Sequence, residues 1–61
     1  MTEAQTRATI RSAAHHGGSF MQKLAIAALA ADPRNRSRIL DAFPEMLAKY
    51  GPGSDLYSEL L

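Results

Sequence analysis

Three arginines lie within five residues, in the run Arg34-Asn35-Arg36-Ser37-Arg38. A guanidinium group is planar and binds phosphate or carboxylate through two parallel N–H bonds. Arg34 and Arg38 are four residues apart and share a helix face, whereas Arg36 points elsewhere. Cations are unfavourable at a helix N-terminus, so helix stability does not explain the cluster. We expect Arg34, Asn35, Arg36 and Arg38 to contact a ligand or partner. The alternative is a solvated face, or one paired with nearby carboxylates: Asp32, Asp41 and Glu45.

A second candidate site is the segment Gly17-Gly18-Ser19, which leads into an expected helix. Glycine-rich backbone before a helix directs amide hydrogens and the positive end of the helix dipole toward an anion. The Ser19 hydroxyl adds a further donor. An ordinary loop followed by a helix cap fits the same residues.

Catalytic and metal chemistry find little support in this chain. His15 and His16 are adjacent, so they do not face the same way on a helix, and no cysteine or suitably spaced carboxylate accompanies them. We interpret them as part of a polar interhelix loop. No nucleophile elbow, phosphate-binding loop or zinc-protease motif occurs. We therefore expect no enzyme, no catalytic residue, no metal site and no cofactor.

The positions of apolar and helix-capping residues predict an all-α fold, a small bundle of three to four short helices in one domain spanning residues 1–61. Thr2 with Gln5, and Ser19 with Gln22, have the spacing of capping boxes. Asp32-Pro33 is a favoured helix start. The helices are expected at residues 2–14, 19–31, 33–42 and 44–50, with a short C-terminal turn at 54–60.

Self-association is expected because the chain is small and has no cysteine. Apolar burial contributes on the order of 85 kcal/mol, and ordering the chain costs roughly 90 kcal/mol. The helix at 19–31 is apolar almost all round, which is typical of a buried helix. A second copy is the expected cover for it and for the apolar C-terminal turn. The residues expected to associate are Phe20, Met21, Leu24, Ala28, Leu29, Leu56, Tyr57 and Leu60.

Location and charge restrict the partners further. The longest apolar run, Leu24–Ala31, is far shorter than the ~20 residues of a membrane helix, and the N-terminus lacks a secretory signal. We expect a cytoplasmic protein without membrane contact. A helix-turn-helix around Asp32-Pro33 would suggest DNA binding, but a net charge of +1 does not supply the broad basic face that DNA requires.

One longer pattern covers about half the chain. Its residues are Leu24-Ala25, Ala28, Ala31-Asp32, Asn35, Arg38-Ile39, Ala42-Phe43-Pro44-Glu45 and Tyr50, followed by Gly51-Pro52-Gly53-Ser54. The stretch from Phe20 to Tyr50 resembles a group of small helical proteins, without an established activity, that tailed phages and prophages encode. The resemblance implies a phage or prophage accessory protein, which would be located in the host cytoplasm. It assigns no functional residue.

Three functions fit these observations. The first is a homo-oligomeric protein that binds a host or phage protein, for example to antagonise host defence, through its arginines and apolar C-terminal turn. The second is a module that sequesters an anionic signalling nucleotide, with Gly17-Gly18-Ser19 and the arginines joined across a subunit interface. The third is a structural, self-assembling component of a larger phage complex.

Overall fold

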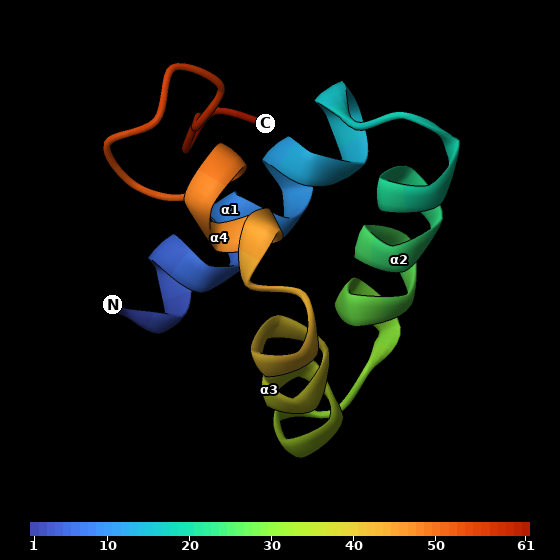
Figure 1. The fold of residues 1–61 in the computed structure, drawn as a ribbon. Helices are drawn as coiled ribbons and strands as arrows, with labels where there is room; N and C mark the ends of the chain where they lie inside the picture. The colour runs from blue at the N-terminus through green and yellow to red at the C-terminus, as the bar shows by residue number, and fades with distance from the viewer.

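Four α-helices and no strand make up the protein, and the computed structural model describes all 61 residues. They are α1 (Glu3–His16), α2 (Ser19–Ala30), α3 (Pro33–Ala42) and α4 (Pro44–Tyr50) (Figure 1). The all-α prediction is confirmed. Helix α1 runs past its expected end, so His15 and His16 lie in its last turn and not in a loop. The C-terminal segment forms turns without a helix.

Local capping explains where the helices begin. At α1, the Gln5 amide donates to the Thr2 hydroxyl at 3.0 Å and the Thr2 amide to the Gln5 side chain at 2.9 Å, which is the expected capping box. At α3, the Asp32 carboxylate accepts from the Asn35 amide at 2.9 Å. Helix α2 begins at Ser19 as predicted, but its predicted capping box is wrong, because Gly18 occupies the cap position and no side chain caps the helix.

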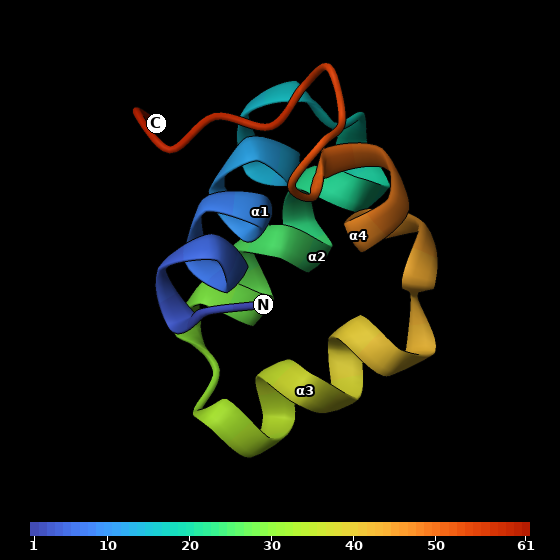
Figure 2. The same cartoon turned by 90° about the vertical axis from the view of Figure 1, so that its left-hand side faces the viewer.

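Helix α1 is the centre of the fold and packs against both α2 and α4 (Figures 1 and 2). A single chain does not bury α2, because only Ala25 and Ala28 of this helix are buried; its cover by a second copy stays a prediction. The outer side of α2 leaves Phe20 62% and Ile26 55% exposed. The core cluster draws on three helices: Ile10, Ala13, Ala25, Ala28, Met46 and Tyr50.

Two buried hydroxyls allow the sparsely apolar α1 to occupy the centre. The Thr9 hydroxyl donates to the Gln5 carbonyl, and the Ser12 hydroxyl to the Ala8 carbonyl, each at 2.8 Å. A buried polar group costs little once it is hydrogen-bonded. Small alanines on α1 and α2 then let the two helices approach closely.

The C-terminal segment, residues 51–61, folds back over α1. Its turn begins where the Ser54 amide donates to the Gly51 carbonyl at 3.0 Å. The Ser58 amide donates to the Ser12 hydroxyl at 3.0 Å, and the Arg11 side chain to the Leu61 backbone oxygen at 2.8 Å. These contacts fix the segment on the side of the molecule away from α3 (Figures 1 and 2).

The folded chain has a surface typical of its size. Its accessible area is 3871 Å², against about 3,900 Å² for a folded monomeric protein of this mass. No helix is both long enough and apolar enough to cross a membrane.

Candidate partner-binding surface

A groove lies along α3, lined by residues of that helix and by Phe43, which follows it. We call it the α3 groove. It has a volume of about 460 Å³ and is the largest of three hollows on the protein. Its lining has two polar side chains toward the start of α3 and three apolar ones toward its end: Asn35, Arg38, Ile39, Ala42 and Phe43.

Two aromatic rings extend this groove onto α2. The rings of Phe20 and Phe43 meet edge to face, with centroids 5.7 Å apart. Phe43 is half-buried because Pro44 ends α3 at this residue and turns its backbone to φ −127° and ψ 71°. Phe20 remains mostly exposed. An exposed aromatic ring beside a partly apolar groove is a surface from which a bound partner would exclude water.

The charge beside the groove is positive and unpaired. Both ion pairs of the protein involve Glu3, which contacts Arg7 and Arg36. Arg38 donates only to the neutral Asn35 side chain, at 3.2 Å. Arg34, one turn earlier on the same face, has no carboxylate partner, and neither has Lys23 on α2. The groove side of the protein therefore carries positive charge that no carboxylate of this chain neutralises.

Arg36 is not part of this surface, which corrects the expectation from sequence. Its side chain is 6% exposed, and its guanidinium group joins three segments. It donates to the Ala28 carbonyl at 3.2 Å, the Ala31 carbonyl at 3.1 Å and the Glu3 carboxylate at 3.2 Å. The two carbonyls belong to the end of α2, where a cation is favourable. Arg36 therefore has a structural role.

The segment Gly17-Gly18-Ser19 does not come near the arginines within one chain. It precedes α2, whereas Arg34 follows it, and a 12-residue helix spans about 18 Å. Gly17 has a different role, in packing. A Cβ atom there would lie 2.6 Å from the Ala13 carbonyl oxygen and 2.9 Å from Cβ of Met21. Only glycine allows α1 and α2 to meet so closely at this corner.

The residues expected to self-associate differ in their exposure in the folded chain. Ala28 is fully buried in the core, so its assignment is wrong for this folded chain. Four others pack partly against that core and offer only an edge: Met21, Leu24, Leu29 and Leu56. Tyr57 is half-buried, and Phe20 and Leu60 are exposed. The exposed members lie at two separate places, the α3 groove and the C-terminal segment.

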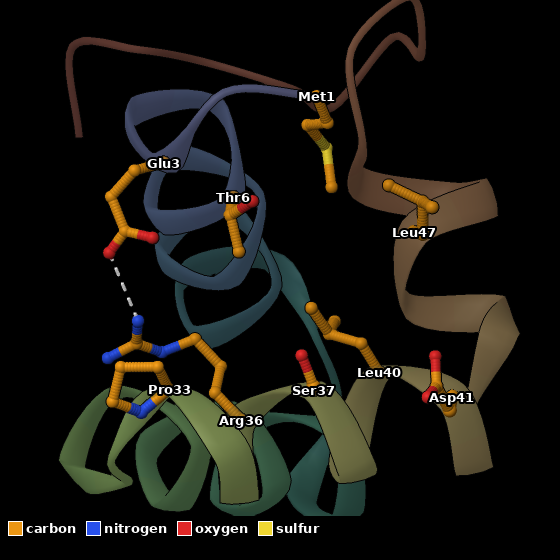
Figure 3. Close-up of a pocket in the computed structure, with 9 residues that line it drawn as sticks. All are labelled: Met1, Glu3, Thr6, Pro33, Arg36, Ser37, Leu40, Asp41 and Leu47. Carbon is orange, nitrogen blue, oxygen red and sulfur yellow. Dashed lines mark hydrogen bonds and ion pairs between the residues drawn. The ribbon is translucent and has the colours of Figure 1, made fainter.

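A second hollow, of about 330 Å³, lies between α1, α3 and α4 (Figure 3). Its wall contains the Glu3–Arg36 ion pair on one side and Leu40 and Leu47 on the other. Because Arg36 and Glu3 are bonded to each other, they do not present a free charge to a ligand. We assign this hollow no binding role.

His15 and His16 stack edge to face at a centroid distance of 4.7 Å. No group of three or more histidine, cysteine or acidic side chains is placed to hold a metal ion.

Comparison with known proteins gives no match: no family model, no curated protein and no solved structure is similar to this chain. The α3 groove therefore has to be interpreted from its own residues.

Proposed function

We propose that this protein is a non-enzymatic phage or prophage accessory protein that binds a host or phage protein through the α3 groove. The observation that carries the proposal is the contact between the exposed Phe20 ring and the half-buried Phe43 ring, beside a groove with cations that no carboxylate pairs. Binding sites on proteins combine an apolar floor with a few polar groups that set orientation, and aromatic and arginine side chains supply much of the energy at interfaces. The phage assignment rests on the sequence resemblance.

The chemistry of the groove suggests the chemistry of its partner. Ile39, Ala42 and Phe43 would contact apolar side chains, while Arg38 and Arg34 would contact carboxylates. A segment complementary to the groove would carry apolar residues flanked by Asp or Glu. Either an amphipathic helix or a short extended peptide can present this pattern. Charge complementarity of this kind contributes mainly to specificity and association rate.

Affinity capture with matched variants tests the proposal. The purified protein is immobilised and exposed to bacterial lysate, and retained proteins are identified by mass spectrometry. We expect one protein to be enriched and to be lost with Arg38→Glu and with Phe20→Ser. A peptide from its acidic, apolar segment should then bind wild type in isolation, and a version with Gln in place of the acids should bind more weakly.

Two control variants make the same chemical change elsewhere. Lys49→Glu reverses an exposed charge on α4, and Ile26→Ser removes an exposed apolar side chain from another side of α2. Both should retain the captured protein. Retention that is unchanged by Arg38→Glu and Phe20→Ser would remove the α3 groove from the function.

A second candidate function, nucleotide binding, is favoured by the free guanidinium groups of Arg34 and Arg38. It requires Gly17–Ser19 of another copy, given the distance within one chain. A ligand selective for the folded state raises the melting temperature by mass action. A panel of linear and cyclic nucleotides at millimolar concentration should then produce a thermal shift, and a flat response would exclude this function.

A further inference from the structure

The C-terminal segment exposes an apolar side chain that nothing in the protein covers. Leu60 is 97% exposed, the highest exposure of any large apolar residue in the chain. It follows Glu59 and precedes Leu61, which is itself 39% exposed. An acidic residue followed by two leucines matches the chemistry inferred above for the groove's partner.

Hydrogen bonds hold this segment in place on α1, so Leu60 does not fold back onto the surface of its own chain. Ser58 is bonded to Ser12, and the Leu61 backbone oxygen accepts from Arg11. In two views related by rotation about the vertical axis, the segment lies at the top of the molecule and α3 at the bottom (Figures 1 and 2). The segment of one chain therefore cannot reach that chain's own α3 groove.

We propose that residues 59–61 of one copy occupy the α3 groove of a second copy, with Leu60 on the apolar floor and Glu59 beside Arg38. Two copies that exchange their segments in this way form a closed, two-fold dimer. The inference rests on the proposed binding role of the groove and names its occupant when no other partner is bound. The same groove then serves self-association and partner capture in competition.

Charge complementarity and the low conformational entropy of the held segment both favour this arrangement. The C-terminal segment carries Asp55 and Glu59 and no basic residue, whereas Arg38 lines the groove and Arg34 shares its helix face. Opposite charges on the two contacting surfaces favour one orientation of the segment. Because Ser12 and Arg11 already hold the segment, binding it costs less conformational entropy than binding a free peptide. The contact is small, so association should depend on concentration.

Two single variants, one in the segment and one in the groove, test the proposal directly. Leu60→Ser removes the inserted side chain, and Arg38→Glu reverses the charge at the groove. Each variant alone should be monomeric in sedimentation velocity at concentrations where the wild type dimerises. Loss of one buried leucine should weaken the dimer about 30-fold per contact. A mixed dimer has one intact contact and one contact that carries both changes, so an equal mixture should associate with an affinity between those of the two variants and below that of the wild type.

A charge exchange provides an independent check. The double variant Glu59→Arg with Arg38→Glu should recover much of the dimerisation lost in each single variant. Circular dichroism should show unchanged helix content throughout, since all three side chains are exposed.

Two outcomes would overturn the inference: a wild type that is monomeric up to millimolar concentration, or a dimer that Leu60→Ser leaves intact. Its failure is distinguishable from failure of the proposed function. Capture of a partner that is sensitive to Phe20→Ser, in a protein that stays monomeric, would retain the groove as a binding site and remove only its self-occupation.

Discussion

Replacing Arg36 with Met should unfold much of the protein, although sequence alone suggests that this arginine is a surface contact. Methionine keeps an apolar stem of similar length but removes three hydrogen bonds. Two of them end on the Ala28 and Ala31 carbonyls, at 3.2 and 3.1 Å, and lie in a nearly water-free position. The third joins Glu3, whose side chain is 65% exposed.

The magnitude follows from these positions. Hydrogen bonds to a charged donor contribute about 1.5–3 kcal/mol each, so the two carbonyl contacts account for about 3 kcal/mol or more. The Glu3 contact, with one partner in solvent, adds less than about 1 kcal/mol. A domain this small has roughly 3–5 kcal/mol of stability in total. Loss of about 3 kcal/mol should lower the melting temperature by at least about 12 °C.

Urea and thermal denaturation followed by circular dichroism would measure this change. Arg38→Met is the matched control, since Arg38 lies two residues away, is exposed and bonds only to Asn35. It should change the free energy of unfolding by less than about 0.5 kcal/mol. If Arg36→Met proved as stable as Arg38→Met, the cost of burying the guanidinium group would equal the gain from its bonds, and the structural role assigned to Arg36 would be refuted.

Three further predictions concern packing and the C-terminal segment. Gly17→Ser should lower the free energy of unfolding by about 1–3 kcal/mol, because its Cβ would overlap Ala13 and Met21. At Gly18 a Cβ has no neighbour within 4 Å, so Gly18→Ser should stabilise α2 by about 0.5 kcal/mol as a better cap. Equal effects of the two variants in denaturation would contradict the packing argument. Ser12→Ala should cost about 1–2 kcal/mol and raise the hydrogen-exchange rate of the Ser58 amide, which loses its acceptor; unchanged exchange would show that the segment is held by other contacts. Partial desolvation and the Glu59 carboxylate, 2.7 Å from the hydroxyl, raise the pKa of Tyr57 above 10.0. The unfolded chain then releases the Tyr57 proton first as pH rises, so stability from this group is complete below pH 10 and is lost above it. The alkaline fall in melting temperature should be smaller in Tyr57→Phe.

Capping chemistry is the part of the fold that sequence predicts best. The Thr2 and Asp32 caps depend on side chains that bond to amides three residues away, so the information is local. The Ser19 prediction fails because Gly18 precedes it with the extended backbone that a cap requires, at φ −72° and ψ −174°. Gln22 is then released to donate to the Ala14 carbonyl at 3.2 Å, across the corner between α1 and α2.

Long-range contacts explain what sequence could not predict. The Arg36–Glu3 contact spans 33 residues, and the Ser12–Ser58 contact spans 46. Hydrophobic periodicity gives no sign of either, because it ranks residues by polarity and all four are polar. Helix α1 consequently has too little apolar character to be recognised as central. Helix α2 has more apolar side chains than the fold buries, and its Phe20 and Ile26 remain exposed.

That surplus of apolar residues on α2 and the C-terminal segment bears on the proposed function. The core contains few large side chains, chiefly Ile10, Met46 and Tyr50, and alanine supplies much of the rest. Burying Phe20 and Leu60 would stabilise the fold, yet both are exposed. In the proposed dimer, Phe20 lies beside the groove of one copy and Leu60 belongs to the segment of the other. Since Arg36 is bonded within the fold and Arg38 is not, the arginine cluster contains one structural member, Arg36, and one member that the proposal assigns to binding, Arg38. Arg36→Met should therefore lower stability, and Arg38→Glu should lower association at unchanged stability.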